Sequence, residues 1–318
     1  MESQHNGVLI TGGAGFVGKA LIRKLLDNNI PTVALDVVGK PDSLPELSKN
    51  FKWLELSYLE VAIDKRQLNE IIDSSNVKTV IHLATTMFPS ASETDLDKDL
   101  LDNMLANTRL FRNLYESGCE KIIFASSGGT VYGQSDKVFH ESDGYNPNIS
   151  YGVNKATTEV YLNYLAQKYD KQAVSLRISN PYGEEQNLEG NQGVIPIFLN
   201  RVSKGLPLTI VGSLKNKRDY VYIGDLTDAF IKVIEYKGQQ KAFNIGSGVP
   251  TSLTELINTI EQKMSTSVKK KLDYQSIDID SSVKLDVSSA KQELNWQASV
   301  SLTCGIEKLI KFHKLKKK

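Results

Sequence analysis

The chain has 318 residues, of which 40% are hydrophobic and 24% are charged. These proportions are typical of a globular protein and exclude a disordered chain, and the sequence has no run of about 20 apolar residues that would indicate a membrane span. The formal net charge of +1 gives no reason to expect a nucleic-acid partner.

Apolar runs of strand length alternate with segments of helical periodicity over the first 180 residues. In chain order, the predicted elements are the strand Gly7–Thr11, the helix Phe16–Leu26, the strand Pro31–Leu35, the strand Val77–Ala84, the helix Leu101–Tyr115, the strand Lys121–Ala125, the helix Tyr151–Tyr169 and the strand Ala173–Ile178. This alternation predicts an α/β fold, with a Rossmann-type, doubly wound parallel sheet that is covered by helices on both faces.

Beyond residue 180 the pattern loosens into segments rich in Gly, Asn and Pro. We interpret residues 181–318 mainly as a smaller C-terminal lobe, and residues 1–180 as the Rossmann domain. Two later strands, Tyr220–Ile223 and Ala242–Ile245, are candidates to return to the first domain.

The first predicted strand runs into the first helix through three glycines, Gly12, Gly15 and Gly18. In a dinucleotide-binding loop the first glycine permits a tight turn, the second lets the backbone approach a pyrophosphate, and the third allows close contact between helix and strand. The helix N-terminus then offers free N–H groups to the phosphates.

The second strand ends at Asp36, eighteen residues beyond Gly18. A carboxylate at this point can accept hydrogen bonds from the adenosine ribose, and it repels a 2′-phosphate. The sequence therefore favours NAD over NADP as the cofactor.

Tyr151 and Lys155 lie one turn apart at the start of a predicted helix. A phenol with a pKa near 10 is a poor base at neutral pH. We expect the ammonium group of Lys155, helped by the positive charge of the oxidised nicotinamide, to lower the pKa of Tyr151 toward the working range of an acid/base catalyst.

These motifs together resemble an extended short-chain dehydrogenase/reductase (SDR) of the NAD-dependent epimerase/dehydratase family, near its UDP-glucose 4-epimerase branch. The resemblance covers nearly all of the chain. The segments that carry it are Thr11–Gly18, Asp36, Val80–Ala84, Ser126–Gly133, Tyr151 with Lys155, Asn180–Gly183, Arg218–Val221 and Asn244–Gly248.

The resemblance implies that the Rossmann domain binds NAD and that the lobe binds a nucleotide-sugar. The implied cofactor-binding residues are Gly12, Gly15, Phe16, Val17, Asp36, Glu55, Leu56, Leu83, Ala84 and Lys155. Tyr151 is then the acid/base for a sugar hydroxyl. Asn180, the backbone near Val194, and Arg218 are implied to grip the nucleotide diphosphate.

The sequence departs from the epimerase pattern where a Ser or Thr normally bonds the reacting oxygen, since Gly128 occupies that position. Ser127, Thr130 or a water can supply the missing hydroxyl, and we favour Thr130. The Asp-Glu pair of the related dehydratases is also absent, because Gly129 and Thr130 stand there. A 4,6-dehydratase is thereby disfavoured.

Two further departures concern the Asn of the mid-chain helix and the substrate. The expected Asn position holds Met104, with Asn103 next to it, and the late arginine that clamps a diphosphate oxygen is missing around Ser276, in Tyr274–Asp280. The substrate can therefore differ from the usual UDP-hexose.

Other noticeable side chains receive structural interpretations. His82 is read as a packed strand residue and not as a catalyst, and Tyr161 and Tyr164 are read as packing residues. Cys119 and Cys304 have no metal-ligand spacing and no signal-peptide segment opens the sequence, so we expect a cytoplasmic protein without a metal or a membrane partner.

Three hypotheses remain. The first is a nucleotide-sugar 4-epimerase that oxidises C4 transiently and regenerates its bound NAD, working as a homodimer. The second is a reductase of a nucleotide-linked 4-keto-sugar, in which the same Tyr151 and Lys155 serve but the cofactor must exchange at each turnover. The third is a non-catalytic NAD-binding protein of this fold, which Gly128 and the missing arginine would explain.

Overall fold

The computed structural model describes residues 6–89, 91–135, 137–190, 192–273 and 282–315. Their contacts divide the chain into two units. The first unit consists of Met1–Gly133, Gly144–Arg177 and Thr227–Phe243, and the second of Gln134–Asp143, Ile178–Leu226 and Asn244–Lys318. The chain crosses between the units several times, and the assignment of NAD to one domain and of the substrate to the other stays a prediction.

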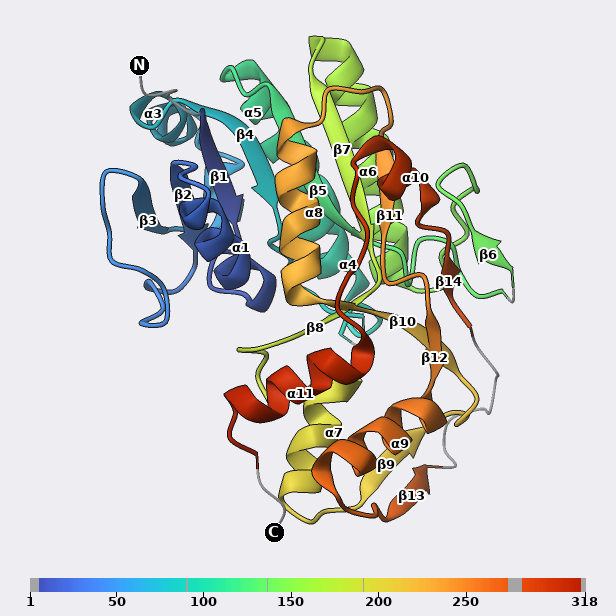
Figure 1. Ribbon diagram of the computed structural model, residues 1–318. Helices are drawn as coiled ribbons and strands as arrows, with labels where there is room; N and C mark the ends of the chain where they lie inside the picture. The colour runs from blue at the N-terminus through green and yellow to red at the C-terminus, as the bar shows by residue number, and fades with distance from the viewer. Residues whose placement is uncertain (1–5, 90, 136, 191, 274–281, 316–318) are drawn as a thin grey trace. The chain divides into compact units, whose positions relative to one another are not determined.

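A seven-stranded sheet organises the first unit (Figure 1). Its strands, in spatial order, are β11 (Ala242–Ile245), β7 (Gln172–Ile178), β5 (Lys121–Ser127), β4 (Val77–His82), β1 (Gly7–Thr11), β2 (Thr32–Asp36) and β3 (Phe51–Glu55). The pairs from β5 to β3 are all parallel. The strand order reverses between β4 and β1, and in such sheets ligands bind beyond the carboxyl ends of the strands at this point.

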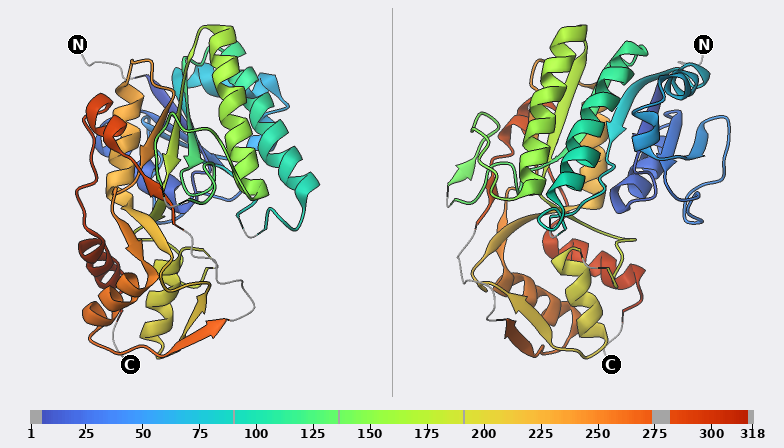
Figure 2. Two further views of the ribbon diagram at one scale, coloured as in Figure 1. Left: turned by 90° about the vertical axis from the view of Figure 1, so that its right-hand side faces the viewer. Right: turned by 180° about the vertical axis from the view of Figure 1, so that it is seen from behind.

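Helices cover both faces of this sheet (Figures 1 and 2). One face carries α2 (Tyr58–Val61), α3 (Lys65–Ser74), α5 (Ala106–Glu116) and α6 (Ser150–Tyr169), whose apolar side chains form a common core with the strands. The other face carries α1 (Phe16–Asp27) and α8 (Ile223–Glu235), which an ion pair between Lys24 and Asp228 joins at 2.5 Å. The predicted Rossmann-type α/β fold is thus confirmed.

The elements predicted before residue 180 all occur in this structure except one helix, and several further elements were not predicted. The alternating segment Phe51–Glu55 forms β3 at the sheet edge, and neither it nor α2 and α3 was predicted. The single helix expected over Leu101–Tyr115 is wrong: α4 (Leu96–Asp99) leads into a π-helical turn, η1 (Leu100–Leu105), before α5 begins. A π-helical turn holds more residues than an α-helical turn and changes which side chains face inward.

The second unit contains three small sheets and four helices among its described residues. The sheets are β12 (Pro250–Ser252), β10 (Lys217–Tyr222) and β8 (Asn180–Tyr182); β13 (Lys270–Asp273) with β9 (Leu208–Val211); and β14 (Lys284–Leu285) with β6 (Val138–Phe139). The helices are α7 (Val194–Ser203), α9 (Leu253–Met264), α10 (Ser288–Glu293) and α11 (Leu302–Phe312). The strand predicted at Ala242–Ile245 does join the main sheet as β11, whereas the one predicted at Tyr220–Ile223 belongs to β10 in this unit.

Candidate active site

The glycine loop forms a tight turn at the carboxyl end of β1. Gly12 has a φ of +76°, and a Cβ atom there would lie 2.9 Å from the backbone nitrogen of Ala84. A Cβ atom on Gly18 would lie 2.3 Å from the carbonyl oxygen of Gly12. Both positions therefore require glycine, for the reasons that the sequence motif predicts.

The N-terminus of α1 is suited to an anion. Gly15 stands at the N-cap and has no side chain to bond the first amide groups, and the first turn holds no acidic residue. The N–H groups at a helix start have no partner within the helix, and they carry the positive end of the helix dipole. Free N–H groups at the start of a helix suit a pyrophosphate group.

The predicted cofactor residues lie together at the carboxyl ends of adjacent strands. Asp36 ends β2 and is paired with Glu55, which ends β3. The Asp36 carboxylate accepts hydrogen bonds from the backbone N–H of Ala14 at 2.9 Å and of Val37 at 2.8 Å, so the glycine loop holds it in place. Two more predicted residues continue these strands, Leu56 beyond β3 and Leu83 beyond β4.

His82 at the end of β4 is a buried structural residue, as predicted. Its ring nitrogens lie 2.7 Å from Oγ1 of Thr11 and 2.9 Å from Oδ1 of Asn107. Burial, together with the charge of Lys155, lowers the pKa of His82 to about 3, so the ring is neutral. It links β4 to β1 and α5 without carrying charge.

Tyr151 and Lys155 lie in the first two turns of α6. The Lys155 ammonium donates a hydrogen bond to the carbonyl of Ala125 at 2.8 Å and lies 5.4 Å from the centre of the Tyr151 ring. Between them, a Cβ atom on Gly152 would lie 2.6 Å from the carbonyl oxygen of Thr130. The glycine thus lets the start of α6 approach the loop after β5, which carries the candidate hydroxyls.

In the protein without a ligand, burial is the largest influence on the pKa values of Tyr151 and Lys155. Desolvation, with a smaller effect from the negative charge of Asp99, raises the pKa of Tyr151 to about 12. Desolvation lowers the pKa of Lys155 to about 8, although Glu159 and Asp99 both oppose this shift. Burial disfavours the charged form of both groups in the protein alone, and the lowering of the Tyr151 pKa expected with bound NAD stays a prediction.

The hydroxyl of Thr130 is available for a ligand. The backbone N–H groups of Thr130 and Val131 donate to the carbonyl of Ser127 at 3.3 and 3.1 Å, which folds residues 127–131 into a turn. Within the described part of the chain, Oγ1 of Thr130 is buried and makes no hydrogen bond. A buried hydroxyl without a partner is costly, so it is a candidate for bonding a substrate atom.

A buried ion pair between Arg177 and Glu159 contacts the loop that follows β5. Arg177 on β7 lies 3.0 Å from the carboxylate of Glu159 on α6 and donates to the Tyr132 hydroxyl at 2.7 Å. Ser126 also donates to Glu159. Sequence reasoning did not find Glu159 or Arg177, because their pairing depends on the contact between α6 and β7.

The N-terminus of α6 is capped by residues far away in the sequence. Ile149 stands at the N-cap, and its side chain cannot accept a hydrogen bond. Instead the N–H of Ser150 donates to Glu93 at 2.5 Å and that of Tyr151 donates to Ser92 at 3.2 Å. The segment before α4 therefore satisfies the first amide groups of the helix that carries Tyr151.

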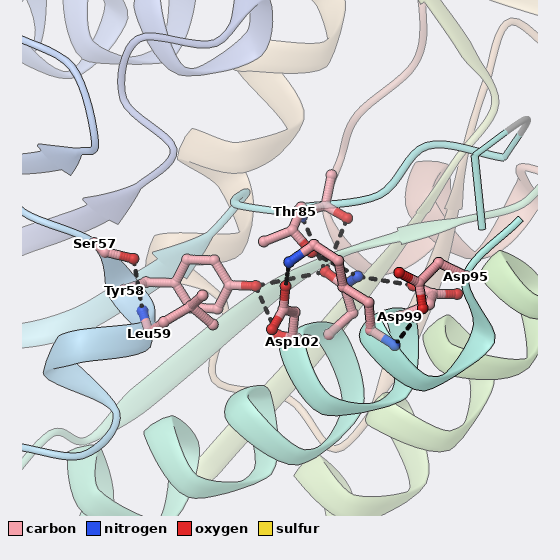
Figure 3. A network of polar contacts seen from close by, with 10 residues as sticks. Ser57, Tyr58, Leu59, Thr85, Asp95, Asp99 and Asp102 are labelled. Atoms are coloured by element: carbon pink, nitrogen blue, oxygen red, sulfur yellow. Dashed lines mark hydrogen bonds and ion pairs between the residues drawn. The ribbon is translucent and has the colours of Figure 1, made fainter.

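The π-helical turn η1 directs Asn103 into a buried polar network (Figure 3). Its side-chain amide donates to Asp99 at 2.8 Å, and its carbonyl oxygen accepts from Oγ1 of Thr85 and from the backbone of Thr86, both at 3.1 Å. Figure 3 also shows Tyr58, whose hydroxyl donates to the backbone carbonyl of Asp102 at 2.8 Å. The irregular turn explains why the buried Asn is Asn103, one position before Met104.

The predicted substrate residues lie in the second unit. Asn180 begins β8 and donates to the carbonyl of Asp219 at 2.8 Å, while Arg218 lies on the neighbouring strand β10. Arg218 donates to the carbonyl of Lys217 at 2.9 Å, and burial lowers its pKa. Val194 is the first residue of α7. The segment Tyr274–Asp280, where the late arginine was expected, lies outside the described residues.

Neither a membrane-spanning helix nor a metal-binding cluster is found among the described residues. No helix in that part of the chain is both long and apolar enough to cross a membrane. The same residues contain no group of three or more His, Cys, Asp or Glu side chains placed to hold a metal ion.

The fold and the site agree with a comparison to known families. Residues 8–246 match the family described as "NAD dependent epimerase/dehydratase family". The chain belongs to this family, and it is an NAD-dependent enzyme with the Rossmann fold of the extended SDRs.

Individual relatives have names of several activities, among them a reductase and 4-epimerases. A protein from Escherichia coli named dTDP-4-dehydro-6-deoxyglucose reductase is 53% identical over 313 residues, which are 98% of each chain. A structure of UDP-glucose 4-epimerase with UDP-glucose from Thermotoga maritima is 30% identical, with a TM-score of 0.87 over 97% of this chain and 98% of that one. The UDP-glucose 4-epimerase of Thermus thermophilus in complex with NAD is 26% identical, with a TM-score of 0.85 over 97% and 99%.

Proposed function

We propose that this protein is an NAD-dependent reductase of a nucleotide-linked 4-keto-sugar, with dTDP-4-dehydro-6-deoxyglucose as its first candidate substrate. The observation that carries this proposal is the 53% identity, over 98% of both chains, to a reductase of that name. The epimerase structures are similar in fold but only 30% and 26% identical. This reverses the order of the two enzyme hypotheses drawn from the sequence.

The site contains a proton donor of the kind that reduction of a carbonyl needs. When bound, reduced NAD would supply the hydride for the C4 carbonyl carbon, and the protein would have to provide a proton for the carbonyl oxygen. Tyr151 is the proposed proton donor, because its raised pKa keeps the phenol protonated at neutral pH. Thr130 is the proposed hydrogen-bond donor to the same oxygen, and Lys155 the cation that stabilises the phenolate left behind.

The remaining site residues are proposed in the same roles as in the sequence-based prediction. Gly12, Gly15 and Asp36 would hold the pyrophosphate and ribose of NAD, which the turn geometry of the loop and the fixed carboxylate support. Arg218 and Asn180, on neighbouring strands, would bind the nucleotide diphosphate of the substrate.

We also propose that the protein is a cytoplasmic homodimer. Its two cysteines are both unpaired, as is usual in a reducing compartment. For the dimer, the support is a stripe of exposed apolar side chains on α6. These are Val153, Val160, Tyr161 and Tyr164, which are 43, 52, 43 and 56% exposed. Tyr161 and Tyr164, which the sequence suggested as packing residues, are exposed in the single chain.

A substrate panel tests the reductase proposal. The purified protein is given dTDP-4-dehydro-6-deoxyglucose with NADH in one arm, and UDP-glucose with NAD in another. NADH absorbance and NMR of the sugar are followed together. In the first arm we expect NADH to be consumed. Each NADH oxidised should give one new hydroxyl group on the sugar. Interconversion of UDP-hexoses without net change in cofactor, and no reaction in the first arm, would establish the epimerase instead.

A further inference from the structure

Asp99 is a buried carboxylate at the end of α4. Asp99 is 1% exposed. Its carboxylate accepts hydrogen bonds from Oγ of Ser150 at 2.7 Å and from the side-chain amide of Asn103 at 2.8 Å. Ser150 is the first residue of α6 and directly precedes Tyr151. Asp99 therefore ties the first turn of α6 to the π-helical segment; Figure 3 shows Asp99 beside that segment.

Asp99 also faces the reacting pair. It lines one small pocket together with Tyr151 and Lys155. The other lining residues are Thr85, Asn103, Asn107, Asn154 and Thr158.

Other ionisable groups near this pair come from three directions. Glu159 lies one turn beyond Lys155 on α6, and its carboxylate is already paired with Arg177. His82 on β4 is neutral because burial lowers its pKa to about 3. Glu93 contacts the backbone of Ser150 at the start of α6.

We propose that Asp99 is a positioning residue of the active site, which holds the first turn of α6 through Ser150 and places a buried negative charge beside Tyr151 and Lys155. The kinetic part of this inference rests on the proposed reductase function. Its structural and electrostatic parts concern the cofactor-free protein.

The charge has a defined effect on the pH dependence. The negative charge of Asp99 raises the pKa of Tyr151 and also raises that of Lys155, since it disfavours loss of a proton from either group. Reduction requires both groups to be protonated, and activity is lost as the pH rises through their pKa values. Removing the Asp99 charge lowers both values and moves this alkaline limit to lower pH.

Three variants separate charge from hydrogen bonding. Asp99→Asn removes the charge and keeps a side chain of the same shape. Ser150→Ala removes the hydrogen bond and keeps the charge. Asp102→Asn is the matched control, because it makes the same change three residues further on, in η1, where the carboxylate pairs with Lys98 at 2.5 Å.

The first measurement needs neither substrate nor cofactor. The protein is labelled at the lysine ε-carbon, the Lys155 signal is assigned with Lys155→Arg, and its titration is followed by NMR. We expect Asp99→Asn to lower the pKa of Lys155 from its value of about 8 by roughly one unit. Ser150→Ala and Asp102→Asn should leave it near the native value. An unchanged titration in a folded Asp99→Asn protein would overturn the proposal.

Amide hydrogen exchange tests the positioning role and covers the case in which Asp99→Asn does not fold. In Ser150→Ala the first amide hydrogens of α6 should exchange faster than in the native protein. In Asp102→Asn their exchange rates should be unchanged. Equal protection in Ser150→Ala and native protein would contradict the role of this hydrogen bond and overturn the proposal.

The kinetic measurement is the pH profile of sugar reduction. Asp99→Asn should move the alkaline limit to lower pH by about one unit, while Ser150→Ala should lower kcat without moving it. If Asp99→Asn lowers kcat but leaves the alkaline limit of the pH profile unchanged, Asp99 has only a structural role, and the proposal is overturned. If the native protein does not reduce the sugar, the proposed function fails, and the lysine titration still decides the inference.

Discussion

Thr130 shows how one side chain connects the structure to the chemistry. Gly128 removes the hydroxyl that the epimerase pattern places in this loop, and the turn over residues 127–131 leaves Oγ1 of Thr130 buried without a partner among the described residues. Gly152 brings the start of α6 against the backbone of the same residue. The hydroxyl and the phenol are therefore carried by segments in direct contact.

Thr130→Val should reduce turnover by about 100-fold or more, because one hydrogen bond made in the transition state is commonly worth about 2.7 to 4 kcal/mol. The melting temperature should stay unchanged or rise, since a buried hydroxyl without a partner is replaced by a methyl group. Ser127→Ala is the control and should have the smaller effect on turnover. A larger loss in Ser127→Ala would transfer the role to that residue.

Arg218 carries the proposed diphosphate contact. Arg218→Ala should raise KM for the nucleotide-sugar by about 10- to 100-fold, the effect of losing one or two charge-assisted hydrogen bonds, while NAD affinity changes little. Arg218→Lys should rescue only in part, because an ammonium group lacks the planar fork. Substrate titrations and calorimetry with NAD measure both quantities, with the exposed neighbour Lys217→Ala as the control. Unchanged KM in Arg218→Ala contradicts the assignment.

At the scale of elements, α6 serves two purposes on two faces. Its first turns carry Tyr151 and Lys155 and are capped by Ser92 and Glu93 from another segment. Its outer face exposes an apolar stripe that includes Tyr161 and Tyr164. This exposed stripe at helical spacing is the support for the proposed homodimer.

A double variant of that face tests the proposed homodimer. Charged side chains in an apolar contact lose their hydration, so Tyr161→Glu with Tyr164→Glu should give a monomer in sedimentation equilibrium, where the native protein has twice the mass of one chain. Val211→Glu, at an exposed residue of β9, is the control and should stay dimeric. A native protein that sediments as a monomer would refute the dimer.

Local sequence was sufficient for the elements with strong periodicity and insufficient for the irregular ones. Gly7–Thr11 is observed with its predicted bounds, and α6 begins one residue before its prediction. The π-helical turn Leu100–Leu105 could not be predicted, because its extra residue is stabilised by bonds from Asn103 to Thr85 and Thr86 that close only in the folded chain. The caps of α6 depend in the same way on contacts that are distant in sequence.

At the scale of the molecule, one sheet edge collects the predicted cofactor residues. The carboxyl ends of β1, β2, β3 and β4 bring together the glycine loop, Asp36, Glu55 and Ala84. This convergence follows from parallel strand order, so the motif spacing could predict it. The direction of the chemistry could not be predicted in this way, because a reductase and an epimerase need the same Tyr151 and Lys155. The support for the proposed reductase comes instead from the 53% identity to a relative of that name.

The most direct test of the central claim is the stoichiometry of cofactor and sugar in native protein and in Tyr151→Phe. With dTDP-4-dehydro-6-deoxyglucose and NADH, we expect the native protein to oxidise one NADH per sugar reduced. Tyr151→Phe should lose this turnover while it keeps its fold and its NAD affinity, because only the proton-donating oxygen is removed. Turnover of Tyr151→Phe within tenfold of the native rate, or sugar conversion without net oxidation of NADH, would contradict the account.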